Sequence, residues 1–313
     1  DADIEQMPIR KGFGEGLLAA GEADERVVGL CADLTESTQM HLFAKKFPNR
    51  FIEIGVAEQN LVTVASGMSA MGKIPFVSSY AMFSPGRNWE QIRTTICYNN
   101  RKVVIAGSHA GVSVGPDGGT HQAIDDIAIM RVLPNMVVLS PCDSIEAKKA
   151  TITAAKTKEP TYIRLAREKT PIITTEETPF EIGKAQVFYK TPIPLTPFPK
   201  GRGGQNFPLG EAGGVVGIIA TGALIHKALL AARELEQEGI AATVVNLSTI
   251  KPLDEDAILT LARECNGLVT VEEHQVAGGM GSAVAEFLAE RHPLPIAFVG
   301  VRDQFGQSGT PEE

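Results

Sequence analysis

Short apolar runs alternate with amphipathic stretches through the first 190 residues of the chain. The apolar runs predict strands at Val27–Ala32, Phe51–Ile54, Ile74–Ser79, Val103–Gly107, Met136–Ser140 and Thr161–Leu165. The amphipathic stretches predict helices at Lys11–Ala20, Met40–Phe47, Ala57–Met71, Asn88–Asn99, Ala123–Arg131 and Ser144–Thr157. Such alternation is typical of a largely parallel sheet with helices on both faces, and such sheets bind ligands beyond the carboxyl ends of their strands.

A second unit of the same kind is predicted after a break in the pattern. Residues 191–214, TPIPLTPFPKGRGGQNFPLGEAGG, are rich in Pro and Gly and predict a linker or a long connection. Beyond them we expect strands at Val215–Ala220, Ala242–Asn246, Gly267–Glu272 and Ile296–Val301, and helices at Leu224–Gln237, Asp254–Arg263 and Gly281–Ala289. The predicted fold class is therefore α/β, with two domains that are each a largely parallel sheet flanked by helices.

Composition narrows the class of protein. The 313 residues suffice for two domains, and a formal net charge of −8 with scattered Lys and Arg argues against a nucleic-acid partner. There is no apolar run of about 18 residues, so we expect no membrane partner. The start, DADIEQMPIRK, is no signal peptide, and the four cysteines form no CxxC pair. Cys31, Cys97, Cys142 and Cys265 are therefore predicted to be free, buried thiols of a cytoplasmic protein.

The end of the chain carries a helix-start signal. Thr310 is a possible N-cap, Pro311 suits the first helical position, and two glutamates follow. The helix that this signal announces is absent from the sequence. We therefore expect the natural protein to continue beyond Glu313.

The candidate chemistry begins with residues 109–122, HAGVSVGPDGGTHQ, which follow a predicted strand. Glycines in such a segment let the backbone adopt positive φ and approach a ligand closely. His109, Asp117 and His121 would then point into a cleft and could bind the hydroxyl groups of a substrate. The alternative is a surface loop whose histidines have no function, and the loop alone leaves both interpretations open.

Two further segments contribute a carboxylate and aromatic rings. In EIGVAEQN at 53–60, Glu58 stands at the start of a helix, where it either interacts with the helix dipole or exchanges a proton with a ligand nitrogen. In YAMFSPGR at 80–87, Tyr80 and Phe83 either stack on a flat heterocycle or pack in the core, and Arg87 follows a helix break.

Cations and hydroxyl groups appear at other predicted element ends. Arg10 and Arg167 suit a phosphate, although solvation at the surface is the common alternative. In CADLTES at 31–37, Asp33 ends a strand, and Thr35 and Ser37 are possible N-caps of the next helix. The sequence has no GxGxxG, no GxxxxGK[ST] and no metal-ligand spacing, so we expect no metal site on this chain.

Together these segments resemble the second half of transketolase, the thiamine-diphosphate enzyme. IRKGFGEGL, ADLTEST, GVAEQN, the aromatic segment, HAGVSVGPDGGTHQ and RLARE follow one another in the order of that family, across nearly the whole chain. The resemblance implies a pyrimidine-binding domain at residues 1–190, a linker at 191–214 and a transketolase C-terminal domain at 215–313. We expect this last domain to serve assembly rather than catalysis.

The resemblance also implies roles for individual residues. Glu58 would bond the aminopyrimidine ring of thiamine diphosphate and exchange a proton with it, Phe83 and Tyr80 would stack on the ring, and Leu34, Val56 and Asp33 would line the cofactor. A substrate phosphate would be held by Arg10, Ser37, His109 and Arg167. Asp117 would recognise a substrate hydroxyl, and His121 would lie near the reacting carbonyl as a second catalytic residue.

The family's GDG…N signature for Mg²⁺ does not occur in this chain. The resemblance therefore implies that an N-terminal transketolase subunit holds the diphosphate and its Mg²⁺ or Ca²⁺ ion, in an α2β2 heterotetramer. The expected activity is reversible two-carbon ketol transfer between ketose and aldose phosphates, as in the pentose phosphate pathway.

Three alternatives remain open. GVAEQN is closer to 1-deoxyxylulose-5-phosphate synthase, whereas His109 and RLARE favour transketolase. The β subunit of a 2-oxoacid dehydrogenase E1 shares the two-domain layout but would not need a phosphate cluster. A non-catalytic homologue that binds only a partner is the third.

Overall fold

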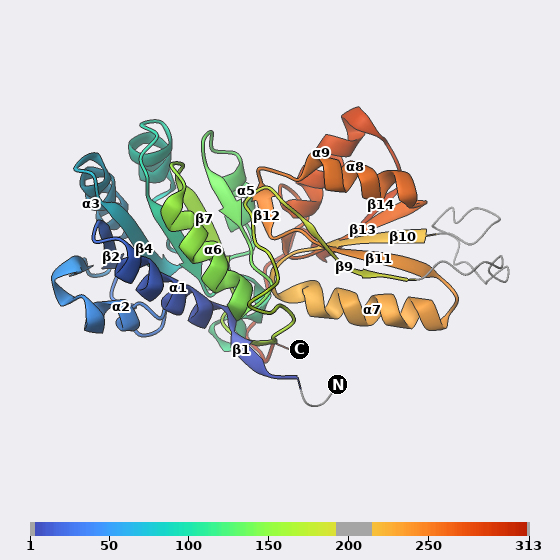
Figure 1. The fold of residues 1–313 in the computed structure, drawn as a ribbon, viewed down its shortest axis with the longest axis horizontal. Coiled ribbons are helices and arrows are strands. Elements are labelled where there is room, and N and C mark those ends of the chain that lie inside the picture. Colours follow the sequence, from blue (N-terminus) through green and yellow to red (C-terminus); the bar gives the residue numbers. More distant parts are fainter. Residues whose placement is uncertain (1–3, 192–214, 312–313) are drawn as a thin grey trace.

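The computed structural model describes residues 4–191 and 215–311, which form two α/β units (Figure 1). The sheet of the first unit has the strand order β12-β6-β7-β5-β4-β2-β3. Its strands are β2 (Val27–Cys31), β3 (Phe51–Glu53), β4 (Ile74–Tyr80), β5 (Val104–Ser108), β6 (Val137–Leu139), β7 (Thr161–Leu165) and β12 (Thr249–Lys251). All the neighbours run parallel except β12, which is antiparallel to β6, so the carboxyl ends of the others share one edge.

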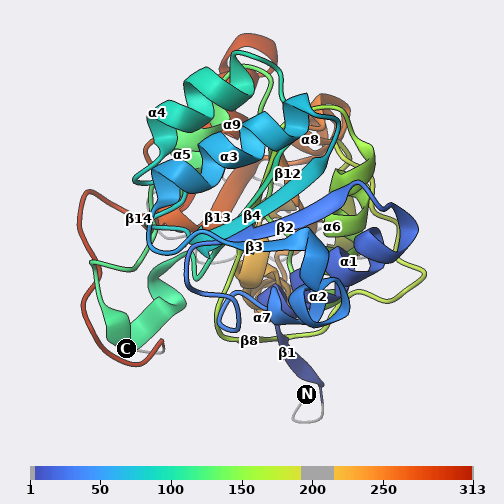
Figure 2. The same ribbon diagram turned by 90° about the vertical axis from the view of Figure 1, so that its left-hand side faces the viewer.

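Helices cover both faces of this sheet because apolar side chains project from each of its faces (Figure 2). One face is covered by α3 (Glu58–Ala70), α5 (Asp126–Arg131) and α4 (Trp89–Gln91), which continues as a π-helical turn at Ile92–Cys97. The other is covered by α1 (Ile9–Ala23), α2 (His41–Lys46) and α6 (Ser144–Lys156). Leu61 of α3 and Phe13 of α1 are fully buried in two separate apolar clusters, one on each face.

The second unit repeats this plan on a smaller scale. Its sheet has the order β14-β13-β10-β11-β9 and consists of β9 (Gln186–Lys190), β10 (Val215–Ala220), β11 (Ala241–Asn246), β13 (Gly267–Gln275) and β14 (Ile296–Val301). Figure 1 shows α7 (Ile225–Gln237) on one face, and α8 (Glu255–Glu264) and α9 (Met280–Arg291) on the other. The predicted fold class, two largely parallel sheets flanked by helices, is confirmed.

The two sheets exchange strands. β9 precedes residue 191 in the chain, yet it pairs with β11 in the second sheet. β12 follows residue 215, yet it pairs with β6 in the first sheet. The sequence analysis predicted neither strand, and its domain boundaries at 190 and 215 stay predictions. The proposed linker, apart from Thr191, lies outside the described residues.

Most predicted elements differ from the observed ones by one to three residues at their ends. The helix predicted at Ala123–Arg131 begins only at Asp126, because Ala123 pairs with another segment of the chain. Its carbonyl accepts a 2.8 Å hydrogen bond from the amide of Gly111, and it forms a bridge with Ala110. Pairing with a distant segment therefore overrides the helical sequence pattern at residues 123–125.

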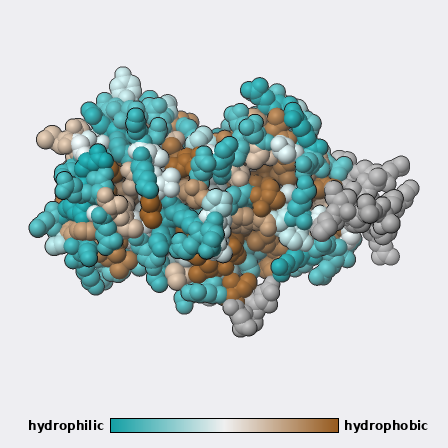
Figure 3. Space-filling model, viewed as in Figure 1, coloured by the Kyte–Doolittle hydropathy of each residue, from teal (hydrophilic) through white to brown (hydrophobic). Residues whose placement is uncertain are grey.

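The surface in Figure 3 is mostly hydrophilic, with hydrophobic side chains gathered toward the centre of that face and over the second unit. None of the helices in the described part of the chain is long and apolar enough to cross a membrane. The four cysteines are free thiols, as predicted, and Cys31, Cys97 and Cys142 are buried. The predicted burial of Cys265 was wrong, because this residue follows the last turn of α8 and is only partly buried.

Candidate functional site

The residues singled out in the sequence follow the carboxyl ends of adjacent parallel strands. In the order of the sheet, Arg167 follows β7, His109 follows β5, Tyr80 ends β4, Ser37 follows β2 and Glu58 follows β3. Arg10 joins them from the first turn of α1. The candidate site therefore lies where ligands bind in sheets of this type.

A compact polar cluster forms at the centre of this edge. Arg10 Nη1 donates to the carbonyl of Ser37 at 2.9 Å and to His109 Nε2 at 2.8 Å. The Ser37 hydroxyl lies 3.0 Å from the Tyr80 hydroxyl and 3.3 Å from His109 Nε2. Residues from four separate segments of the chain thus meet at one point.

A short two-stranded ribbon brings Arg167 toward this cluster. β1 (Gln6–Pro8) pairs antiparallel with β8 (Lys169–Pro171), so Arg10 and Arg167 flank the same end of the ribbon. Burial lowers the pKa of Arg10, and the positive charge of Arg167 lowers it further. Two guanidinium groups that repel each other in this way favour an anion between them.

Arg167 also contacts the glycine-rich loop. Its Nη1 donates to the carbonyl of Val114 at 2.9 Å and lies 3.3 Å from Asp117 Oδ2. The loop therefore presents Asp117 beside a cation, and both side chains are partly solvent-exposed. A carboxylate and a guanidinium held together can accept from and donate to neighbouring hydroxyl groups of a ligand.

His109 is buried and neutral. Burial lowers its pKa to about 3, and the nearby charges of Arg10 and Arg167 act in the same direction. Since Nε2 accepts from Arg10, the proton belongs on Nδ1, which lies 2.9 Å from the Ser108 hydroxyl. The sequence analysis placed His109 among the groups that neutralise a phosphate; in the free chain it is an acceptor, and the positive charge comes from the arginines.

An aromatic wall connects this cluster to Glu58. The ring centroids of Tyr80 and His109 are 4.1 Å apart, and Tyr80 stacks near Phe83 at 6.3 Å. His121 packs edge-on against Phe83 at 5.3 Å, and its Nδ1 lies 2.9 Å from the Thr120 hydroxyl. Tyr80 and Phe83 are therefore walls of the site and not residues of the core.

Glu58 begins α3, and its side chain is almost completely buried, with 4% of the residue exposed. Its carboxylate oxygens accept from Arg87 Nη1 at 3.3 and 3.2 Å. The Arg87 guanidinium also lies over the Phe83 ring, 4.2 Å from its centroid. A planar group with N–H donors therefore fits between the Phe83 face and the Glu58 carboxylate. An aminopyrimidine ring is also planar, and it offers an N–H group to a carboxylate once a ring nitrogen is protonated, so these residues suit the ring that the resemblance implies.

The loops after β2 and β3 complete this end of the site. Val56, two residues before Glu58, is 68% exposed, so its apolar side chain is open to contact with a ligand. Leu34 packs partly into the core, and Asp33 has a left-handed backbone with φ 58°. Asp33, Leu34 and Ser37 line an open hollow of ≈ 670 Å³.

Glu53 holds these two loops together, and the sequence analysis did not identify it. Its Oε1 accepts from the amides of Asp33 at 2.7 Å and Gly55 at 2.9 Å. Its Oε2 accepts from the Thr35 hydroxyl at 2.9 Å. The interpretation of Thr35 and Ser37 as N-caps was therefore wrong, because both side chains bond across the sheet edge and α2 begins later.

In the described residues, no group of three or more His, Cys, Asp and Glu side chains is arranged to bind a metal ion. The other residues that the sequence analysis missed are Arg87, which it noted without a role, and Glu273 of the second unit. Glu273 accepts a hydrogen bond from the Ser113 amide. No local sequence signal could have identified this contact, because its partners are 160 residues apart.

Comparisons with known proteins find similarity over nearly the whole chain. The family described as "Transketolase, pyrimidine binding domain" matches residues 5–172, and "Transketolase, C-terminal domain" matches residues 209–313. A solved structure titled "Split gene transketolase, inactive beta4 tetramer" is 43% identical, with a TM-score of 0.85 over 98% of this chain and 91% of that chain.

Two curated relatives show the range of activities among similar proteins. A 6-deoxy-6-sulfo-D-fructose transketolase subunit from Clostridium sp. is 38% identical over 99% of this chain and 89% of its own length. A 1-deoxy-D-xylulose-5-phosphate synthase from Syntrophus aciditrophicus is 36% identical over 96% of this chain but only 43% of its own length.

Proposed function

The chain belongs to the transketolase family, and we propose that it is the C-terminal subunit of a split transketolase. It would supply the pyrimidine half of a thiamine-diphosphate site and the wall that binds a sugar phosphate, for two-carbon ketol transfer between ketose and aldose phosphates. One observation carries the proposal. Glu58 and Phe83, which both contact Arg87, lie on the same sheet edge as the polar cluster of Arg10, Ser37 and His109, and Tyr80 connects the two groups.

The cofactor end of the site depends on Glu58. Membership of the family implies dependence on thiamine diphosphate, which supplies the nucleophilic carbon that accepts and passes on the two-carbon unit. Glu58 would hydrogen-bond a ring nitrogen of the aminopyrimidine and exchange a proton with it, donating as the carboxyl group and accepting as the carboxylate. Phe83 would stack on the ring, and Val56 and Leu34 would contact its apolar side. Arg87 must turn away from Glu58, which its 51% exposed side chain allows.

The substrate end depends on charge. Arg10 and Arg167 would bind the phosphate with charge-assisted hydrogen bonds, and the Ser37 hydroxyl would add a neutral donor. Asp117 and His121 would bond to the hydroxyl and carbonyl groups of the sugar. Because a site built from paired donors and acceptors rejects analogues that leave them unpaired, these two residues would set the preference for a sugar.

The remaining half of the site would come from a partner. We propose an N-terminal transketolase subunit that holds the diphosphate and its Mg²⁺ or Ca²⁺ ion, in an α2β2 assembly. The titles of the similar proteins support this, since they describe a transketolase subunit and a split-gene transketolase. Four free cysteines are consistent with a reducing, cytoplasmic location.

Replacing Glu58 with Gln tests the proposed function. In the enzyme reconstituted with its partner, we expect the turnover number to fall by about 10²–10⁴-fold, because a general acid–base group is lost. Binding of thiamine diphosphate, followed by the fluorescence of Trp89, should weaken as well. Glu290→Gln, on the exposed face of α9, serves as the control. An unchanged rate in Glu58→Gln would exclude the catalytic role.

The relative that is a 1-deoxy-D-xylulose-5-phosphate synthase makes a second donor class worth testing. An enzyme that takes its two-carbon unit from a 2-oxoacid releases carbon dioxide, whereas transfer from a ketose phosphate does not. Assaying both donors with the same aldose phosphate separates the two activities. If only the 2-oxoacid is turned over, the chain is part of a 1-deoxyxylulose-5-phosphate synthase or an E1 enzyme, and the proposal of a transketolase is wrong.

A further inference from the structure

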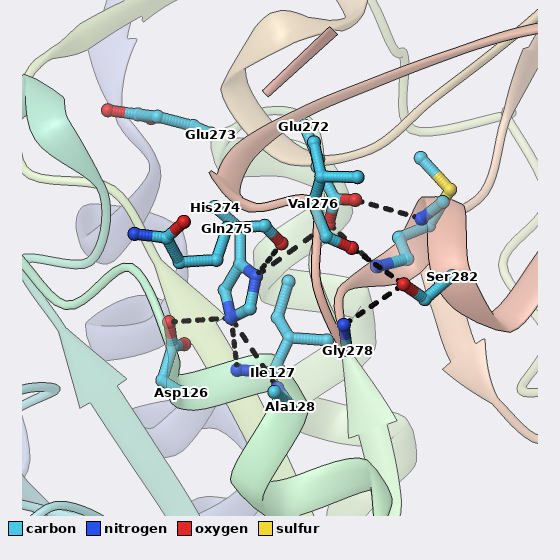
Figure 4. A network of polar contacts seen from close by, with 12 residues as sticks. Asp126, Ile127, Ala128, Glu272, Glu273, His274, Gln275, Val276, Gly278 and Ser282 are labelled. Carbon is cyan, nitrogen blue, oxygen red and sulfur yellow. Dashed lines mark hydrogen bonds and ion pairs between the residues drawn. The ribbon is translucent and has the colours of Figure 1, made fainter. Parts of the chain in front are cut away.

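Three consecutive buried residues of β13 face the junction between the two units (Figure 4). Glu272 accepts from the amides of Met280 and Gly281 at 2.6 and 2.8 Å, at the start of α9 in its own unit. His274 Nε2 accepts from the amides of Ile127 at 3.1 Å and Ala128 at 3.4 Å, at the start of α5 in the first unit. Glu273 points away from both of these side chains (Figure 4) and contacts a third segment.

That segment is the glycine-rich loop of the candidate site. The amide of Ser113 donates to Glu273 Oε1. The backbone at Gly111 runs so close that an added Cβ would lie 2.3 Å from the Glu273 carboxyl carbon and 2.5 and 2.6 Å from its oxygens. Gly111 also has φ 92°, which other residues rarely adopt. The loop backbone is therefore shaped around this one carboxylate.

The strand that carries Glu273 is itself fixed to the first unit. Arg164 Nη2 donates to the Glu273 carbonyl at 2.8 Å, and Arg164 Nε pairs with Asp126 at 2.9 Å. All three side chains are buried. Since a buried ion pair holds its geometry closely, the Glu273 carboxylate has little freedom to follow a moving loop.

The second unit also contacts the C-terminal end of the loop, near Gln122. Gln122 Nε2 donates to the carbonyls of Val112 and Gln307, both at 3.1 Å. Residues 306 and 308 lie against 118 and 119. Figure 2 shows the C-terminal segment, in red, running beside the loop. The second unit thus contacts the loop on both sides of Asp117.

Burying the Glu273 carboxylate costs more free energy than an apolar contact with the loop would. Burial raises the pKa of Glu273, and the charge of Arg164 opposes this rise. Taking a charge out of water costs free energy that few contacts recover, so a purely structural contact would more commonly be apolar. A carboxylate brings instead a directional acceptor that sets where the Ser113 amide lies.

We propose that Glu273 is a positioning residue for the sugar-phosphate site, through which the second unit holds His109 and Asp117 opposite Arg10 and Arg167. This inference rests on the proposed function of that site. It assigns the second unit a part in substrate binding, where the sequence analysis expected assembly alone.

Kinetics of the reconstituted enzyme test the proposal. Glu273→Ala removes the acceptor, and we expect the KM for the sugar phosphate to rise by about tenfold or more, because small displacements of binding groups are costly. The turnover number should change less than about threefold, since Glu58 is untouched. Glu273→Gln keeps a carbonyl oxygen for the Ser113 amide and should restore most of the affinity.

Glu272→Gln is the matched control, because it removes the neighbouring buried carboxylate without touching the loop. It should leave the KM unchanged. A lower turnover number at constant KM in Glu273→Ala, or the same KM rise in both variants, would overturn the proposal.

Amide hydrogen exchange on the isolated chain gives a test that does not depend on activity. In Glu273→Ala, the amides of residues 111–115 and 117 should exchange at least about tenfold faster than in the parent chain, and Glu273→Gln should restore most of the protection. Those at the starts of α5 and α9 should not change. Equal acceleration across the chain, or none in the loop, contradicts the positioning role. If exchange in the loop accelerates but no variant changes the KM for any sugar phosphate, the proposed function of the site is wrong, and only the contact between Glu273 and the loop is supported.

A substitution from the loop side covers the case in which the Glu273 variants do not fold. Gly111→Ala places a methyl group against the carboxylate and should raise the KM as Glu273→Ala does. Gly72→Ala is its control, because Gly72 has a similar φ of 83° but nothing within 4 Å of the added Cβ. A KM that rises in neither variant, or equally in both, counts against the proposal.

Discussion

The protonation state of His109 is set by its neighbours in the fold and differs from that of a free histidine. A free histidine has a pKa near 6.5, but burial and two adjacent arginines lower the pKa of His109 to about 3. The ring therefore stays neutral and accepts a hydrogen bond from Arg10. A third positive charge there would be repelled by the two guanidinium groups, so the buried imidazole serves as an uncharged hydrogen-bond acceptor beside them.

This state makes a prediction about pH. Below pH 6.5 the unfolded chain binds a proton at His109 that the folded chain does not bind until about pH 3. The free energy of unfolding should therefore fall as the pH decreases through this window. Denaturant titrations at several pH values should show a shallower fall for His109→Gln. A ring NMR signal of His109 that titrates near pH 6.5 would contradict the neutral state.

Arg167 should control the affinity for phosphorylated substrates. We expect Arg167→Ala to raise their KM by about 10–100-fold, the effect of losing one charged hydrogen bond. Donors without a phosphate should respond far less. Arg93→Ala removes an exposed arginine of the π-helical turn and provides the control. An unchanged KM in Arg167→Ala would place the phosphate elsewhere.

Many of the residues that the sequence analysis selected do meet at one edge of the sheet. They stand directly after apolar strands, and the carboxyl ends of parallel strands converge. Glu53, Arg87 and Glu273 escaped prediction for a different reason. Each acts on a partner 18 to 160 residues away in the chain, and no local pattern encodes such a contact.

At the scale of elements, the start of α6 shows how one side chain fixes a helix to its surroundings. Asp143 Oδ1 accepts from the amide of Glu146 at 2.9 Å and from the Thr174 hydroxyl at 2.8 Å. Its Oδ2 accepts from the amides of Ile173 at 2.9 Å and Thr174 at 2.6 Å. The carboxylate thus caps α6 and also holds the segment that leads toward β9.

Removing this carboxylate should be costly. We expect Asp143→Ala to lower the free energy of unfolding by about 2–4 kcal/mol, because the fully buried side chain leaves several donors unpaired. Denaturant unfolding measures the change. Asp256→Ala, in the exposed first turn of α8, should change it by less than about 0.5 kcal/mol. Similar losses in both variants would show that the cap has no special importance.

Elements with a long apolar period were predicted within a few residues, whereas those defined by their partners were not. β12 has three residues and exists because β6 offers an open edge. β9 alternates weakly, and its place in the second sheet depends on β11. Short strands of this kind carry too little periodicity to be recognised without the sheet that they join.

At the scale of the whole molecule, the exchanged strands and a shared core join the two units. One apolar cluster contains Ile127 and Met130 of the first unit together with Leu268 and Met280 of the second. A buried polar group at the same junction, Arg164 with Asp126 and the Tyr162 hydroxyl, adds directional contacts. Such continuity leaves no boundary at which one unit could unfold alone.

The molecule should therefore unfold in one cooperative step. Trp89 is the sole tryptophan of the chain and reports on the first unit, whereas far-UV circular dichroism reports on both. We expect the two signals to give the same thermal midpoint. Leu268→Ala creates a cavity in the second unit and should therefore lower both midpoints by the same amount. If Leu268→Ala leaves the midpoint from tryptophan fluorescence unchanged, the two units unfold independently.

The exchange of β9 and β12 also bears on the inheritance of this protein. A recombination event between the two units would leave each product with a missing strand and a bare sheet edge, which invites aggregation. Genes that separate the units in this way should be eliminated by selection. We therefore expect the two units to be inherited together, and insertions or fusions to be tolerated better at the ends of the pair than between the units.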